Sequence, residues 1–329
     1  MIRKILKWAA MLLLVAIIGI GVWGYAPDIP AKELRAKYAN AESEFVKLDN
    51  GLTVHVRDEG PKDAPAIILL HGSNASLHTW EQWTKQLSRE YRIIRFDQIG
   101  HGLTGPDLKG DYGAAAFVDT VNRVAQNRGL DRFYLGGNSM GGWVTHEYAK
   151  QHPDRLLGII LVDAGGAPDA QPKALPIGFR IARLPVLNQL ARFITPRGVI
   201  ETSLKQSVSN QAVVTDAEVD EYWELLRHPG NRKATGDRFA QYGKRNTGSV
   251  ISAATRKLPA LILWGDEDKL IPVSSAKWFA STYSDSVTHI YKGIGHLPME
   301  EAPDQSAGDV SDWLADQKGQ SQSNQATLR

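Results

Sequence analysis

A run of small residues around one serine constrains this chain more than any other stretch: Gly-Gly-Asn-Ser-Met-Gly-Gly at positions 136–142. A strand-like segment precedes the run and a helix-like segment follows it. A serine at such a sharp turn has a strained backbone, so Gly137 and Gly141, two residues to either side, must stay small. The turn exposes the hydroxyl of Ser139 and places the amide of Met140 at a helix N-terminus, where negative charge is stabilised. The run therefore predicts a nucleophile with one oxyanion-hole donor beside it.

Eight apolar runs of strand length alternate with helical patterns along most of the chain. The turn Asp49-Asn50-Gly51 joins the first two runs as a hairpin, whereas helix-length segments such as 79–90, 114–128 and 140–152 separate most of the others. This alternation predicts an α/β fold with a mostly parallel eight-stranded sheet flanked by helices. The runs lie at 45–48, 52–56, 66–70, 92–96, 133–135, 158–162, 260–264 and 287–291.

One long segment, 167–248, interrupts the alternation because it contains no strand-like run. It is predicted to form several helices, such as 176–194 and 216–227, and to be a helical lid over the carboxyl ends of the strands. The core is then 43–166 together with 249–315. Residues 27–42 are polar and predict a stalk or a helix lying along the domain. Residues 316–329 are rich in Gln and Ser and predict a disordered tail.

The N-terminus carries Arg3, Lys4 and Lys7 before an uncharged stretch from Trp8 to Pro27. About 20 helical residues span roughly 30 Å, the thickness of a bilayer core. Three interpretations are open for residues 1–26: an uncleaved transmembrane anchor, a cleaved signal segment, or a buried core helix. A proline directly after the small-x-small pattern disfavours cleavage, and a basic flank is wrong for a core helix. We therefore predict a membrane anchor, with the catalytic domain outside the cytoplasm, periplasmic or extracellular.

Charge and cysteine content exclude several function classes. The formal net charge is +2, and Lys and Arg are scattered along the chain, so no nucleic-acid partner is predicted. The chain has no Cys, which excludes disulfides, thiolate metal sites and a cysteine nucleophile. No cofactor and no metal site is predicted.

A serine hydroxyl needs a base to take its proton and an acid to orient that base. His296 supplies the base, because it follows the last strand on a glycine-containing loop, Gly293-Ile294-Gly295. Three carboxylates, Asp266, Glu267 and Asp268, follow the preceding strand and are candidates for the acid.

These motifs and their order resemble those of the α/β-hydrolase-fold serine hydrolases. The resemblance covers roughly residues 43 to 315, and it assigns the acid to Asp268, with Asp163 after an earlier strand as the alternative. It also assigns the second oxyanion-hole donor to Ser73, in the loop His71-Gly72-Ser73-Asn74. Asn74 is predicted either to donate toward the substrate or to cap the helix near Leu77.

A further segment, Asp97-Gln98-Ile99-Gly100-His101-Gly102, resembles a motif that has a structural role in that family. The competing interpretation, a metal site built on Asp97 and His101, lacks further ligands nearby in the sequence.

The resemblance implies hydrolysis of a carboxylic ester with an acyl or lipid-like group. The motif Gly-Asn-Ser-Met-Gly-Gly is also shared with C–C bond hydrolases that act on ring-fission products. Those enzymes usually carry a Trp after the catalytic His, where this chain has Leu297. Amidase and perhydrolase activity of the same fold stay open. Within the lid, residues 179–193 mix Arg with apolar residues, which favours either an ordinary lid helix or one that contacts the membrane.

Overall fold

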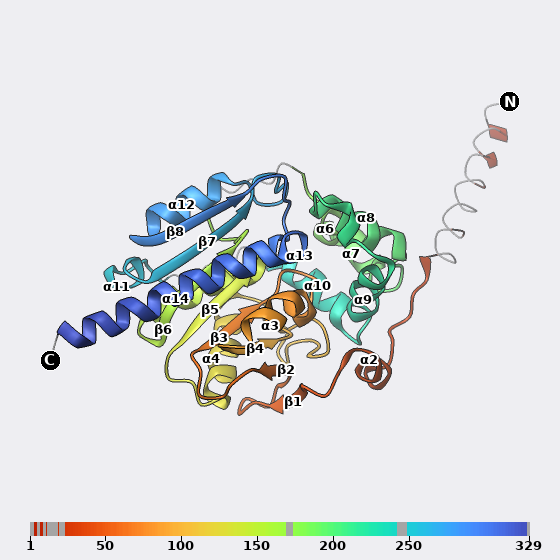
Figure 1. The fold of residues 1–329 in the computed structure, drawn as a ribbon. Helices are drawn as coiled ribbons and strands as arrows, with labels where there is room; N and C mark the ends of the chain where they lie inside the picture. The colour runs from red at the N-terminus through yellow and green to blue at the C-terminus, as the bar shows by residue number, and fades with distance from the viewer. Residues whose placement is uncertain are drawn as a thin grey trace.

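The computed structural model describes residues 24–168, 174–241 and 249–327, together with isolated positions before residue 24. Its centre is one eight-stranded sheet in the order β1-β2-β4-β3-β5-β6-β7-β8 (Figure 1). The strands β1 and β2 pair antiparallel with their neighbours. The other six strands, β3 to β8, are parallel to one another. The predicted fold is confirmed. The strands are β1 (Ser43–Lys47), β2 (Thr53–Glu59), β3 (Ala66–Leu70), β4 (Arg92–Phe96), β5 (Phe133–Asn138), β6 (Leu156–Val162), β7 (Pro259–Gly265) and β8 (Asp285–Tyr291).

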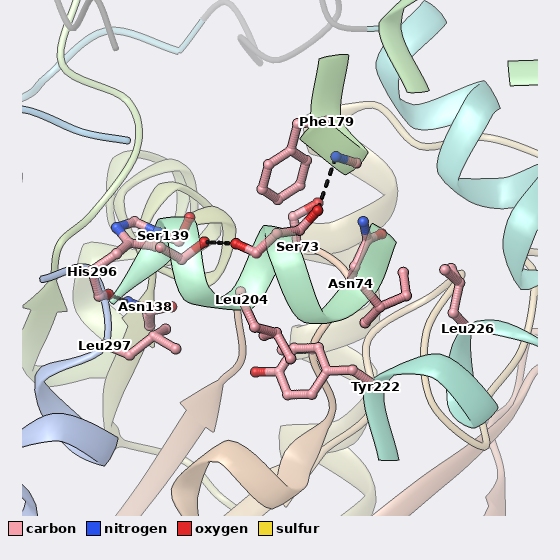
Figure 2. A pocket seen from close by; sticks show the side chains of 16 residues that line it. Ser73, Asn74, Asn138, Ser139, Phe179, Leu204, Tyr222, Leu226, His296 and Leu297 are labelled. Atoms are coloured by element: carbon pink, nitrogen blue, oxygen red, sulfur yellow. Dashed lines mark hydrogen bonds between the residues drawn. The ribbon is translucent and has the colours of Figure 1, made fainter. Parts of the chain in front are cut away.

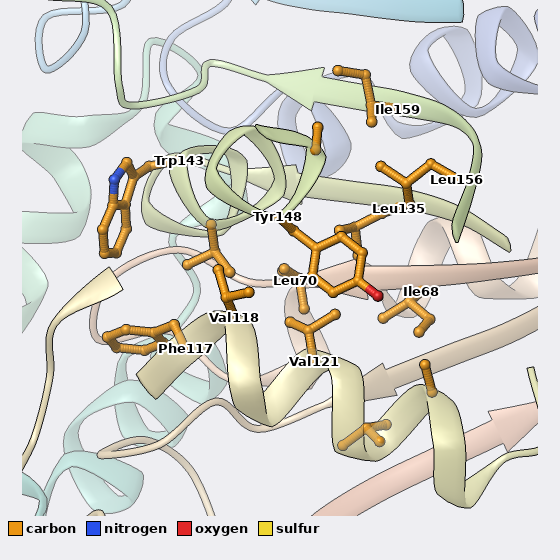
Figure 3. Close-up of a cluster of buried hydrophobic side chains, with 14 of the residues drawn as sticks. Ile68, Leu70, Phe117, Val118, Val121, Leu135, Trp143, Tyr148, Leu156 and Ile159 are labelled. Carbon is orange, nitrogen blue, oxygen red and sulfur yellow. The ribbon is translucent and has the colours of Figure 1, made fainter. Parts of the chain in front are cut away.

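Helices cover both faces of this sheet, which explains why its central strands are continuously apolar. In β3, Ile68 and Leu70 point to the cluster that includes α4 (Ala114–Asn127), α5 (Met140–Gln151) and α12 (Ser274–Thr282), shown in part in Figure 3. Ile67 and Leu69 point to the other cluster, with α3 (Glu81–Leu87) and α14 (Pro303–Thr327). Alternate residues of one strand therefore enter two cores.

The described part of the insertion between β6 and β7 consists of helices joined by turns and loops, and its helices gather on one side of the sheet (Figure 1). We call helices α6 to α10 the lid. The segment predicted as one helix over 176–194 is divided, because Leu184 precedes Pro185 and takes an extended conformation, with φ −89° and ψ 118°. The lid helices are α6 (Ile177–Arg183), α7 (Pro185–Leu190), α8 (Arg197–Ser207), α9 (Asp216–Leu226) and α10 (Asn231–Ala240).

The segment before β1 lies along the domain, which is the second of the two sequence interpretations. Its helix α2 (Ala31–Tyr38) lies beside α9, buries Leu34, and pairs Lys37 with Glu224 at 2.7 Å (Figure 1). Within the described residues, no helix has the length and apolar character needed to cross a membrane. The anchor predicted over residues 1–26 lies mostly outside them.

The C-terminal segment differs from the predicted disorder of 316–329, because α14 continues to Thr327. Its Gln, Ala and Lys residues favour a helix, whereas Gly319 and the Ser and Asn residues after it favour a helix less. The first turns of α14 are packed on the core through Val310, Trp313 and Leu314. The anchored start explains how a polar extension continues as a helix.

Candidate active site

Ser139 lies at the turn between β5 and α5, and its backbone has the strained conformation that the sequence predicts, with φ 54°. The flanking glycines are required by close backbone approaches. A Cβ on Gly137 would lie 2.3 Å from the carbonyl carbon of Gly141, and a Cβ on Gly141 would lie 2.1 Å from the oxygen of Leu70. The turn is thus packed too tightly for any side chain at these two positions.

His296 and Asp268 form a buried pair at the ends of neighbouring strands. The Nδ1 atom of His296 is 2.8 Å from Oδ2 of Asp268, and both side chains are at most 5% exposed. The other carboxylate oxygen, Oδ1, accepts from the amides of Leu270 and Ile271 at 2.7 and 3.1 Å. These bonds fix the carboxylate, which in turn fixes the orientation of the imidazole.

Asp163, the alternative acid, lies directly beside this pair. One polar atom each from Asp163, Asp268 and His296 fall within 4.8 Å of one another. Burial, together with the charge of Asp268 and a hydrogen bond to it, raises the pKa of Asp163 well above its usual value. The raised pKa favours the uncharged form of Asp163, whereas the carboxylate that contacts His296 belongs to Asp268.

The same three residues are the one group in the described part of the chain with a spacing that would suit a metal ion. Their chemistry does not favour this role. The hydrogen bond between His296 and Asp268 uses one ligand atom of each, and the raised pKa of Asp163 favours its protonated form, which is a poor ligand.

The loop after β3 approaches Ser139 closely through Gly72. A Cβ on Gly72 would lie 2.8 Å from Oδ1 of Asn138 and 3.4 Å from Cβ of Ser139. The peptide between Gly72 and Ser73 is thereby brought to the nucleophile turn, and Met140 is the first residue of α5. The two predicted oxyanion-hole residues, Ser73 and Met140, are thus on segments that meet at Ser139.

Asn74 does not cap the following helix. The N-cap of η1 (Leu77–Trp80) is Ser76, whose hydroxyl accepts from the amide of His78. That interpretation of Asn74 was wrong, because Asn74 has a left-handed backbone with φ 64° and its side chain points to the lid. Its Oδ1 accepts from the hydroxyl of Thr235 at 3.0 Å, and the residue lines the cavity described below.

Arg238 of α10 is a site residue that the sequence analysis missed. Its guanidinium donates to Oδ1 of Asn74 at 2.6 Å and to Oγ of Ser73 at 3.1 Å, and it also contacts Nε2 of His101. The side chain is buried, with 4% of the residue exposed. A lid residue is thereby bonded to two successive residues of the predicted oxyanion loop.

Asp97 has the structural role that the family resemblance implies. Its carboxylate accepts from the amides of Leu77 and Leu103 and contacts Nδ1 of His55, each at 2.7 to 2.8 Å. Burial alone would raise its pKa, but the contact with His55 keeps the pKa well below its usual value. His101 is engaged elsewhere, with the oxygen of Ile99 and with Arg238.

A cavity of about 670 Å³ lies between the core and the lid. Figure 2 shows Ser139 and His296 at one end and Leu226 at the other, with Phe179, Leu204 and Tyr222 of the lid along it. A second cavity of about 580 Å³ adjoins it, and residues shared by both are Asn74, Gly178, Ile200 and Leu226. Most of the lining is apolar, so the site is suited to a long apolar group attached to a reacting polar centre.

Comparison with known proteins gives matches to one family and to characterised relatives. A family model described as alpha/beta hydrolase fold matches residues 65–303. Lipase 1 of Psychrobacter immobilis is 24% identical over 280 residues, which cover 82% of this chain and 83% of the relative. A 2-hydroxy-6-oxononadienedioate/2-hydroxy-6-oxononatrienedioate hydrolase of Comamonas testosteroni is 23% identical over 291 residues, which cover 83% of this chain and 96% of the relative.

Among solved structures, a membrane phospholipase A described as a novel bacterial virulence factor superposes with a TM-score of 0.71. The two chains are 22% identical, and the match covers 97% of this chain and 99% of the other. At this identity the likeness shows a shared fold and nothing about the substrate.

Proposed function

The chain belongs to the α/β-hydrolase fold family, and we propose that it is a serine hydrolase that cleaves carboxylic esters. One observation carries the proposal: the buried pair of His296 and Asp268 lies at the end of an apolar cavity that Ser139 also lines. A strained, partly buried serine that lines the same cavity as an oriented imidazole is the arrangement that acyl transfer requires.

The proposed reaction has two halves. Ser139 Oγ attacks the ester carbonyl carbon while His296 Nε2 takes the hydroxyl proton, and the amides of Ser73 and Met140 bind the resulting oxyanion. Collapse of this intermediate breaks the bond to the alcohol oxygen, which receives the proton from His296. A water molecule then attacks the acyl-enzyme with His296 as base, so that the carboxylic acid leaves and Ser139 is regenerated. Asp268 stabilises the imidazolium in both halves.

The shape and chemistry of the cavity support an acyl or lipid-like ester. None of the residues known to line the catalytic cavity is Lys, Arg, Asp or Glu. In this cavity a substrate with two carboxylates, such as the one named for the Comamonas relative, would meet no cationic side chain, and Arg232 lines only the adjoining second cavity. Carbon–carbon bond hydrolysis is therefore the second candidate, favoured by the sequence at positions 137–142 and by that relative.

The test is a substrate screen combined with a covalent probe. We expect a fluorophosphonate probe to label the wild-type chain and to leave Ser139→Ala unlabelled, with Ser73→Ala as the matched control that is labelled. A series of esters of increasing acyl length, run beside a ring-fission product and a matched amide series, should give the highest kcat/KM with a medium or long ester. Faster turnover of the ring-fission product would replace ester hydrolysis with the second candidate.

We also propose that residues 1–26 attach the protein to a membrane, with the enzyme domain outside the cytoplasm. The basic flank, the uncharged stretch and the unfavourable cleavage context at Pro27 support this. Cell fractionation and N-terminal sequencing test it, because a soluble mature chain that begins near Pro27 would show a cleaved signal instead.

A further inference from the structure

The outer surface of α7 is apolar where a lid helix facing water would be polar. Large apolar side chains on this surface are exposed: Leu184 50%, Val186 72%, Leu187 41%, Leu190 51% and Phe193 62%. Contiguous exposed apolar patches on a folded protein indicate a surface that is covered in use. With Tyr25, which is 62% exposed, we call these residues the lid face.

The opposite surface of α7 already has a use. Asn188, together with Ala191 just after the helix, lines the second cavity, which adjoins the catalytic cavity. The inner surface of α7 thus lines a cavity, whereas its outer surface is apolar and exposed. Packing within the chain explains only the inner surface.

The segment that contains the lid face is basic in sequence. Between Asp169 and Glu201 it has no acidic residue, whereas it has Arg180, Arg183, Arg192 and Arg197. Two of these arginines are paired within the lid, Arg192 with Asp237 and Arg197 with Asp216 and Asp220, so the basic character of the lid face depends on Arg180 and Arg183. Arginine beside exposed leucine and phenylalanine is typical of surfaces that lie on anionic lipid, where the apolar side chains enter the acyl boundary and the guanidinium groups meet the phosphates.

The chain itself brings the uncharged N-terminal stretch to this place. The amide of Ala26 donates to the oxygen of Phe193 at 2.9 Å, and the amide of Thr195 donates to the oxygen of Gly24 at 3.0 Å. The stretch without charge, from Trp8 to Pro27, therefore ends in direct contact with the lid face. Any membrane that holds the N-terminus lies next to that face.

We propose that the lid face docks on an anionic lipid bilayer, so that α7 separates the bilayer from the second cavity. The proposal deepens the proposed function, on which its last step rests: an acyl chain leaving the bilayer passes α7 into the second cavity and reaches Ser139 through the catalytic cavity. A second copy of this chain would also cover apolar residues, but the basic residues Arg180 and Arg183 of the same segment disfavour pairing with an identical surface.

The absence of Cys provides a direct test, because one introduced cysteine is a unique labelling position. Leu190→Cys and, as the matched control, Val287→Cys on β8, which is 44% exposed, are each labelled with an environment-sensitive fluorophore in the full-length protein. The proteins are reconstituted into phosphatidylcholine vesicles with and without phosphatidylglycerol and with brominated lipid. We expect a blue shift and bromine quenching at position 190 that increase with phosphatidylglycerol, and neither at position 287.

A pair of substitutions tests the functional step. Leu187→Ser with Leu190→Ser should lower turnover of a long-chain ester embedded in vesicles by about tenfold, since two leucine side chains lose their apolar transfer, while turnover of a short soluble ester stays unchanged. Solvent-like fluorescence at position 190 in anionic vesicles would overturn docking. A blue shift that depends on protein concentration without vesicles would replace the bilayer with a second copy. Quenching in a protein that cleaves no ester would keep the docking and reject the proposed function.

Discussion

The core and the lid form facing walls of one cavity, yet different interactions hold them in place. In the core, two apolar clusters on either side of the sheet position the strands, and their members include Ile68, Phe133 and Trp264. Where the lid meets the core and the N-terminal segment, several buried groups are instead charged or titratable. Arg238 bonds to the loop after β3, Arg232 bonds to Ala26 and Asp28, and Glu221 bonds to Ser76.

The difference shows which interactions determine the fold and which determine the orientation of the lid. Apolar packing rewards any close fit, so it determines the fold but tolerates small displacements. A buried polar group has a preferred direction, and leaving it unpaired costs about 1–3 kcal/mol. The orientation of the lid over Ser139 therefore depends in part on these polar contacts, each of which a single substitution removes.

The largest expected effect lies in the core. Ser139→Ala, Asp268→Ala and His296→Ala should each lower kcat by about 10⁴- to 10⁶-fold because the three residues act as a unit. Ester hydrolysis and thermal unfolding are measured together, and unfolding should change little. Near wild-type turnover in Asp268→Ala would transfer the acid role to Asp163 and break the proposed division between the two carboxyls.

Arg238→Met should produce the next largest effect, a loss in kcat of about 10- to 100-fold with a smaller change in KM, because Ser73 loses its bond to Arg238 and Asn74 keeps only its bond to Thr235. Arg232→Met is the matched control, a buried lid arginine that bonds to Ala26 and Asp28 instead. Steady-state kinetics of both variants decide the matter. Equal losses in kcat would mean that lid stability, rather than the contact with the oxyanion loop, is what both arginines provide.

Substitutions of Asp163 test a buried polar group that belongs to the core. Asp163→Asn should retain kcat within about threefold, since the raised pKa of Asp163 favours the uncharged carboxyl and an amide has the same shape. Asp163→Ala should lower the free energy of unfolding by about 1–3 kcal/mol, because the amide of Gly265 loses its acceptor. Urea unfolding and ester kinetics measure both variants. A large kcat loss in Asp163→Asn would show that the carboxyl ionises during catalysis.

The smallest effect concerns the pH dependence of the lid. Burial and the neighbouring Glu218 raise the pKa of Glu221 to about 8. Because the folded chain binds this proton more tightly than the unfolded chain, the stabilisation is complete below the ordinary pKa of glutamate and is lost as the pH rises to about 8. Glu221→Gln should flatten this slope and raise Tm at pH 8 by a few degrees at most. Differential scanning calorimetry at pH 5 and pH 8 checks it; identical slopes in both proteins would contradict it.

The parts predictable from sequence were those in which neighbouring residues carry the signal. All eight strands and the turn at Ser139 follow from apolar runs and glycines a few residues apart. Arg238 was not predictable, because its partner Ser73 is 165 residues away and an arginine in a lid helix looks like any exposed cation. The break at Leu184 was readable from Pro185, but the apolar pattern around it obscured the signal. Local patterns could thus be predicted from the sequence, whereas polar contacts between residues far apart in the chain could be found only in the structure.

The bonds of Gly24 and Ala26 to the segment after α7 give the lid a further attachment, besides its two chain connections and its polar contacts with the core. A lid connected only through its two chain ends can rotate about them, whereas the contact with the N-terminal segment couples any movement of that segment to the lid. Force on the N-terminus therefore acts on the lid directly. Removal of the N-terminal chain past residue 30, to obtain an easily handled enzyme, abolishes this coupling. Rates measured on such a trimmed chain describe a lid with one restraint fewer than the full-length protein has.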